Sequence, residues 1–112
     1  MRTEEQKANL RKLVEALRSG QYKQGAGRLH PTDDTYCCLG VMCDISGVEA
    51  WVKNTTFGWC FSGAHTAYPP KSVSSLFGLS TFQMDALVQR NDTGKTFEEI
   101  ARYIEEELIG SD

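Results

Sequence analysis

The amphipathic pattern of the first twenty residues constrains the fold most. Within residues 3–19 the apolar side chains recur at the spacing of a single helix face, and they are Leu10, Leu13, Val14 and Leu17. Thr3 is a favourable N-cap, Gln6 stands where its capping-box partner belongs, and Gly20 ends the segment. The sequence therefore predicts a helix over residues 3–19 that buries one face.

A second capped amphipathic segment lies at the other end of the chain. Thr96 and Glu99 have the capping-box spacing, and Gly110 closes the segment. Its apolar stripe consists of Phe97, Ile100, Ala101, Ile104 and Leu108. These features predict a last helix that packs on a core.

The segments between these helices indicate two kinds of structure. Residues 21–36 break the helical period and predict a loop or short irregular strands. Residues 37–46, CCLGVMCDIS, are almost wholly apolar, so a buried strand and a buried helix both fit, and the helical spacing of Leu39, Met42 and Cys43 favours a buried helix. Residues 48–68 are rich in β-formers and predict two or three short antiparallel strands.

Two more helices are expected before the last one. Pro69-Pro70 opens the first of them and Gly78 ends it. Ser80 can cap the next, which has Phe82, Leu87 and Val88 among its apolar residues and ends at a polar turn over residues 90–94. The sequence thus predicts one mostly helical α+β domain over residues 1–112, with about four to five helices and a small antiparallel β element around residues 48–68.

Charge and hydropathy exclude several classes of protein. No apolar run approaches the ~20 residues of a membrane span, and the N-terminus has no apolar core of a secretory signal, so we expect a cytoplasmic protein. The formal charge of −3 makes non-specific nucleic-acid binding unfavourable. Seven bases and three acids lie in residues 1–30, against five bases and twelve acids in the rest. Either the N-terminal part forms a basic face for an anionic partner, or the first and last helices pack together and neutralise each other.

The cysteines allow three interpretations. They are Cys37, Cys38, Cys43 and Cys60. In a reducing compartment we expect free, buried thiols that act as small apolar residues, with no metal and no cofactor. A zinc site with His30 or His65 is the first alternative, although only Cys38 and Cys43 approach the spacing of a zinc knuckle. A catalytic thiol with a histidine base is the second alternative.

The best candidate for a binding site is the segment YKQGAGR, residues 22–28. Gly25 and Gly27 would let backbone N–H groups point into one concavity, bracketed by Lys23 and Arg28. A phosphate or nucleotide would suit it, with an aromatic ring stacked on the base; a tight turn with solvated charges is the alternative. The full set of expected ligand-binding residues is Tyr22, Lys23, Gln24, Gly25, Gly27, Arg28, Trp51, Asn91 and Asp92.

Two further motifs give weaker signals. Residues 94–96, Gly-Lys-Thr, resemble the end of a P-loop, but Gln89 replaces the required first glycine, and turn chemistry with a helix cap explains the segment. The last two helices have the layout of a helix-turn-helix, but the second is too acidic to approach DNA. The aromatic residues Trp51, Phe57, Trp59, Phe61 and Tyr68 are expected in the core, with one or two rings at a rim.

Three stretches together resemble a group of small bacteriophage and prophage proteins. They are LRSGQYKQGAGRL (17–29), YCCLGVMCD (36–44) and NDTGKTFEEIARYIE (91–105). The resemblance implies a viral setting and no mechanism. By analogy we expect a non-enzymatic accessory protein, for host takeover or against host defence, that sequesters a small phosphorylated or nucleotide ligand in the host cytoplasm.

Other partners and activities are also open at this point. A chain of 112 residues encloses a pocket more easily between subunits, so a homo-oligomer is expected. The first alternative function is inhibition of a host protein through the acidic last helix, with Glu98, Glu105 and Glu106. The second is a small enzyme with a cysteine nucleophile.

Overall fold

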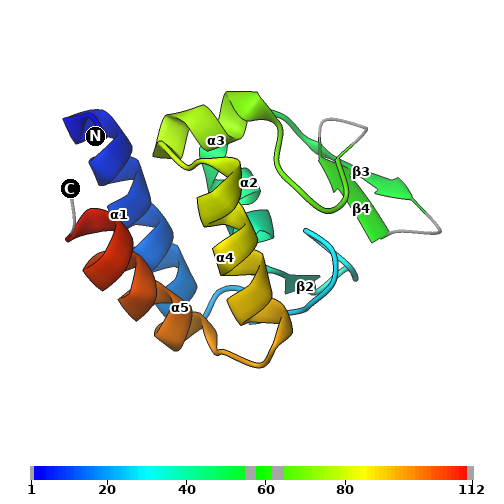
Figure 1. Ribbon diagram of the computed structural model, residues 1–112. Helices are drawn as coiled ribbons and strands as arrows, with labels where there is room; N and C mark the ends of the chain where they lie inside the picture. Colours follow the sequence, from blue (N-terminus) through cyan, green and yellow to red (C-terminus); the bar gives the residue numbers. More distant parts are fainter. Residues whose placement is uncertain (1, 55–57, 62–64, 111–112) are drawn as a thin grey trace.

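The computed structural model describes residues 2–54, 58–61 and 65–110, and Figure 1 shows their arrangement. The helices in this part of the chain are α1 (Glu4–Arg18), α2 (Cys38–Ser46), α3 (Lys71–Phe77), α4 (Thr81–Asp92) and α5 (Phe97–Tyr103), which continues into the π-helical turn η1 (Ile104–Ile109). The strands β1 (Lys23–Gln24) and β2 (Thr35–Tyr36) pair in parallel, and β3 (Trp51–Asn54) and β4 (Gly58–Phe61) pair antiparallel. The expected mostly helical α+β fold with a small antiparallel element is confirmed.

The helix ends lie where the local signals predict them. The Thr3 hydroxyl accepts a hydrogen bond from the Gln6 N–H at 3.1 Å, and the Gln6 side chain accepts one from the Thr3 N–H at 2.9 Å. Thr96 and Glu99 form the same reciprocal box at the start of α5. Gly47 ends α2 in the left-handed conformation, which confirms the predicted buried helix with a glycine stop.

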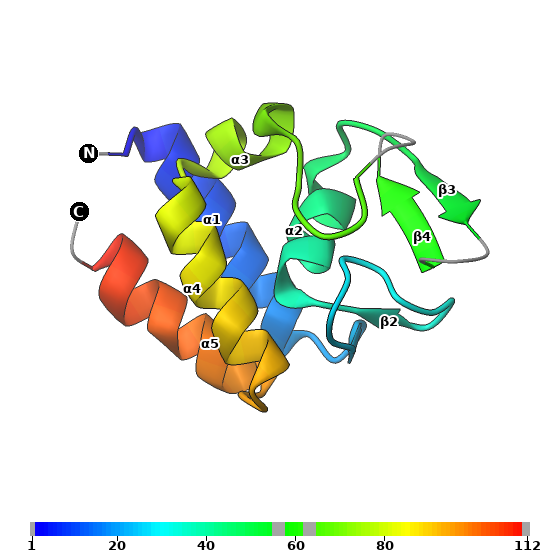
Figure 2. The ribbon, with the colours of Figure 1, turned by 45° about the vertical axis from the view of Figure 1, so that its right-hand side comes forward.

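Helix α2 is the centre of the molecule. It contacts α1, α3 and α4, and every residue from Cys38 to Cys43 is buried. Figure 2 shows α1, α4 and α5 on one side of it and the β3–β4 hairpin on the other. The predicted stripes of α1 and α5–η1 complete the core, since Leu10, Leu13, Ile100 and Ile104 are fully buried.

The first and last helices pack together, as one of the two interpretations of the charge asymmetry required. The Arg18 guanidinium bonds the Glu98 carboxylate at 2.8 Å and the Glu105 carboxylate at 2.9 Å. These two contacts join the C-terminal end of α1 to α5 and η1. The excess base of the N-terminal part is therefore partly neutralised within the chain.

Phe82, in the first turn of α4, does not face the core, because its side chain is 82% exposed. The structure also corrects the predicted end of this helix. The helix continues through Asp92, so Asn91 and Asp92 belong to its last turn and not to the following loop.

The aromatic residues divide between core and rim. Phe61 is fully buried, Trp51 and Trp59 are half-buried, and Tyr68 is exposed; Phe57 lies outside the described residues. None of the helices described is long and apolar enough to cross a bilayer.

A close backbone approach fixes α2 against the preceding loop. A Cβ atom added at Gly40 would lie 1.8 Å from the Leu29 carbonyl oxygen. Gly40→Ala should therefore lower the free energy of unfolding by about 3 kcal/mol, because backbone atoms must move apart. Urea denaturation measures the loss. Gly20→Ala is the control: Gly20 has a φ of +78° but open space around it, so only about 1 kcal/mol is expected. Equal losses for the two variants would contradict this account of Gly40.

Candidate functional site

The two glycine-containing polar segments singled out in the sequence meet in the structure. Gln24 makes the junction. Its amide nitrogen donates to the Asn91 side-chain oxygen at 3.0 Å and to the Lys95 carbonyl at 2.7 Å. Its amide oxygen accepts from the Phe97 N–H at 3.0 Å, at the start of α5. The loop after β1 is thereby held against the turn between α4 and α5.

Asn91 is a buried hub beneath this junction. Its side-chain nitrogen donates to the Gly25 carbonyl at 2.8 Å, and its oxygen accepts from the Cys38 N–H at 3.2 Å at the start of α2. The residue is only 4% exposed, so these bonds replace water that cannot reach the amide. The amide therefore connects the loop, α2 and α4, which is a structural role that the sequence did not indicate.

The glycine N–H groups already have acceptors. The Gly25 N–H donates to the Tyr36 carbonyl at 2.8 Å. The Gly27 N–H donates to the Asp92 carboxylate at 3.1 Å. A carboxylate oxygen of the chain thus lies where the sequence analysis placed a phosphate oxygen, and Asp92 satisfies the loop.

A hollow of about 330 Å³ remains beside this junction. Its walls are formed by Gln24, Gly25, Ala26, Asn91, Gly94, Lys95 and Thr96. Three of the expected binding residues therefore line it, and Lys95 is a lining residue that was not among them. The available signal was the Gly-Lys-Thr triplet, which we interpreted as a turn and a cap.

Lys95 also lines a second hollow, of about 540 Å³, beside α5. Arg90 and Arg102 line the same hollow, together with Glu99 and two further glutamates. The Arg90 guanidinium stacks on the Tyr103 ring, 3.6 Å from its centroid, which fixes its position. The lining of this hollow thus combines three basic and three acidic side chains.

Tyr22 and Trp51 belong to a different cluster. The Tyr22 hydroxyl and the Trp51 indole N–H both donate to the carboxylate of Asp44, at 2.5 Å and 3.0 Å. Partial burial and this carboxylate raise the pKa of Tyr22. Neither ring lines the hollow beside Gln24, so the structure does not bring the expected stacking residues to the expected phosphate site.

The aromatic rings around His30 form a packed stack. The imidazole lies between Tyr36, at 3.9 Å, and Trp59, at 5.5 Å, with nearly parallel planes. Its Nδ1 atom is 2.7 Å from the Thr35 carbonyl, which can only accept, so Nδ1 carries the hydrogen. The Trp59 indole donates to Asp33, which lowers the pKa of that carboxyl. The stack attaches the β3–β4 hairpin to the loop before α2.

The four cysteines are buried free thiols. Burial raises the pKa of Cys37 to about 11 and raises the pKa values of Cys38 and Cys43 as well. These three sulfurs are therefore protonated at neutral pH, which is unfavourable for a nucleophile. Within the described ranges, no three His, Cys, Asp or Glu side chains lie close enough to hold a metal ion.

The acidic last helix is partly engaged within the chain. Glu98 and Glu105 bind Arg18, and their side chains are about half exposed, while Glu106 is exposed on the surface. Two of the three glutamates expected to meet a host protein are thus already ion-paired.

Comparison with known proteins identifies a family. Residues 5–81 match the model of a family described as a domain of unknown function, DUF8296. The chain belongs to this family. The matched part extends from the first turn of α1 to the first residue of α4, so it contains the loop over residues 22–28 but not Lys95. No curated protein and no solved structure matches the chain.

The bonds of Asn91 predict a large effect of removing its amide. Asn91→Ala should lower the free energy of unfolding by about 3 kcal/mol, because the Cys38 N–H and the Gly25 carbonyl lose their buried partner. Urea denaturation measures this loss in the free energy of unfolding. Asn9→Ala removes one half-buried bond, to the Leu76 carbonyl, and should cost only about 1 kcal/mol. If Asn91→Ala were no worse than Asn9→Ala, the amide would not be a hub.

The burial of the thiols predicts their reactivity. In a Cys60→Ser variant, which leaves Cys37, Cys38 and Cys43, an aromatic disulfide reagent at about pH 8 should react at least about 100-fold more slowly with the folded protein than with the protein in urea. The cause is the scarcity of thiolate and the lack of access. One thiol that reacts in the folded state as fast as in urea would contradict this and would favour a cysteine nucleophile.

Proposed function

We propose that this protein is a non-enzymatic binding protein for a small phosphorylated ligand of the nucleotide class. The observation that carries the proposal is the meeting of the Gln24–Ala26 loop with the Asn91–Thr96 segment around a hollow with Lys95 in its wall. The two segments are some seventy residues apart, and each has the glycine and polar composition from which anion sites are built.

The phosphate is best placed beside Lys95. The Gly27 N–H is bonded to Asp92, so a phosphate on the glycines would have to displace a carboxylate. Lys95 lines both hollows, and no acid in the described part of the chain forms a close ion pair with its ammonium group. Arg90 and Arg102 add positive charge on the α5 side, beside three glutamate carboxylates, and Arg suits a phosphate through its planar fork.

Binding, and not turnover, fits the chemistry of the site. The side chains that line the hollow beside Gln24 carry two amides, one hydroxyl and one ammonium group, and the thiols of Cys37 and Cys38 are buried in the core. We propose that the protein acts in the cytoplasm of a phage-infected cell, where it withdraws a nucleotide signal from the host. The resemblance to small phage proteins supports this setting.

The test begins with native mass spectrometry of the protein purified from a nucleotide-rich cell extract. A bound phosphorylated compound is expected, which denaturation releases for identification. Titration calorimetry with that compound should show affinity reduced by about tenfold or more in Lys95→Glu, because a charge-assisted contact becomes repulsive. Lys71→Glu, an exposed charge reversal at the start of α3, is the matched control and should bind normally.

Two results would contradict the proposal. One is a ligand-free mass together with no heat from nucleoside triphosphates or cyclic dinucleotides, which would favour inhibition of a host protein. The other is full affinity in Lys95→Glu with loss of binding in a Lys23→Glu, Arg28→Glu double variant. That outcome would return the phosphate to the glycine loop.

A further inference from the structure

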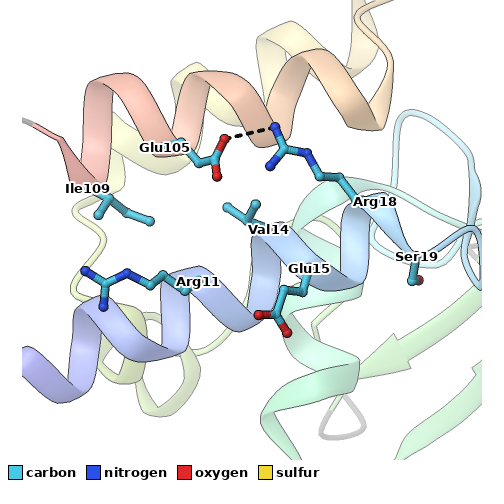
Figure 3. A pocket seen from close by; sticks show the side chains of 7 residues that line it. All are labelled: Arg11, Val14, Glu15, Arg18, Ser19, Glu105 and Ile109. Carbon is cyan, nitrogen blue, oxygen red and sulfur yellow. Dashed lines mark ion pairs between the residues drawn. The ribbon is translucent and has the colours of Figure 1, made fainter.

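A groove with an apolar floor lies between α1 and η1, and it shares no lining residue with the hollows that Lys95 lines. Its volume is about 510 Å³ (Figure 3). Ile109 supplies apolar surface, with the buried Val14 at the base of the groove, and the Arg18–Glu105 ion pair spans one end. Arg11 lies at the other end, beside Ile109. This volume is in the range of sites that bind organic groups.

The widened helix on one wall is a second, independent feature of this groove. The Gly110 N–H donates to the Glu105 carbonyl at 2.8 Å, a bond five residues back, so the chain is wound as a π-helix over Ile104–Ile109. Such turns are less favourable than α-helix and occur frequently at functional sites. Here the turn contributes both Glu105 and Ile109 to the groove.

Helix α4 carries an exposed apolar side chain and an acid that are complementary to the apolar floor and the Arg11 guanidinium of this groove. Phe82, in the first turn of α4, is 82% exposed and is the most exposed large apolar residue of those described. Asp85 follows one turn later on the same helix face and is also exposed. The Tyr68 hydroxyl donates to this carboxylate at 2.6 Å, which holds it in place and leaves its second oxygen for another partner.

We propose that the groove receives Phe82 of a second copy of this chain. The phenyl ring packs on Val14 and Ile109, and the Asp85 carboxylate of the entering copy pairs with Arg11. Charge complementarity favours this occupant. Arg11 forms no ion pair within the described residues, and the entering helix α4 carries Asp85 one turn after Phe82.

The geometry of the contact determines the type of assembly. The Phe82 side chain and the groove lie on different surfaces of the chain, so the contact is head-to-tail. Each copy supplies one Phe82 and one groove. Copies then add in a closed ring or an open row. The phosphorylated ligand proposed above does not suit this groove, because its floor is apolar and its Arg18 guanidinium is already paired with Glu98 and Glu105.

The test is sedimentation equilibrium of the full chain up to about 1 mM, the concentration range in which weak contacts are populated. The wild-type mass should rise with concentration. Phe82→Ala, Arg11→Asp and Asp85→Arg should each weaken association by about tenfold or more. All three side chains are exposed, so circular dichroism should show an unchanged fold.

The decisive arm mixes Arg11→Asp with Asp85→Arg. In the mixture a carboxylate at position 11 faces a guanidinium at position 85, and the remaining wild-type pair is also complementary. Association should therefore return to near the wild-type level. Val52→Ala, an exposed apolar residue on the hairpin, and Lys12→Asp, a charge reversal on α1 outside the groove, should leave association unchanged.

Three outcomes would overturn the proposal. They are a wild-type chain that stays monomeric at about 1 mM, association that persists in Phe82→Ala, and a mixture that fails to recover. A monomeric wild type would leave the groove for an occupant other than this chain.

Discussion

The buried amide of Asn91 is the contact on which the arrangement of the loops depends. It bonds the Gly25 carbonyl, the Cys38 N–H and the Gln24 side chain, and it joins three segments that share no local sequence. Leaving a buried donor or acceptor unpaired costs more free energy than a satisfied hydrogen bond contributes, so these bonds support one another. The loop over residues 22–28 is consequently part of the core structure, although most of its surface is exposed.

This dependence changes how the glycine loop can be used. From the sequence we expected a phosphate at the N–H groups of Gly25 and Gly27. In the structure these N–H groups donate to the Tyr36 carbonyl and the Asp92 carboxylate. Asp92 stands one residue from Asn91 at the end of α4, so the same helix end supplies both the hub and the internal anion. The next basic side chain along the chain is Lys95, one turn further on, where we propose that an external anion binds.

Local sequence patterns predicted most of the helices and their ends. Hydrogen bonds between residues far apart in the chain could not be predicted from such patterns. The caps at Thr3 and Thr96 and the stop at Gly47 depend on neighbouring residues, so their patterns could be identified from the sequence. The Gln24–Asn91 bond joins residues 67 positions apart and has no such pattern. Phe82 is exposed although it is apolar, because it stands two residues before the buried Met84, roughly 200° around the helix and so on the opposite face.

The hollow beside Gln24 and the groove between α1 and η1 lie near opposite ends of one helical segment. Lys95 precedes α5, and Ile109 ends η1, so along the helix axis they are roughly 20 Å apart. Charges at that separation are screened in physiological salt, where interactions fade over roughly 8 Å. Arg18 clamps the segment between them through Glu98 and Glu105. Substitutions at the two surfaces should therefore act independently, so a lost ligand and a lost self-contact can be assigned to separate causes.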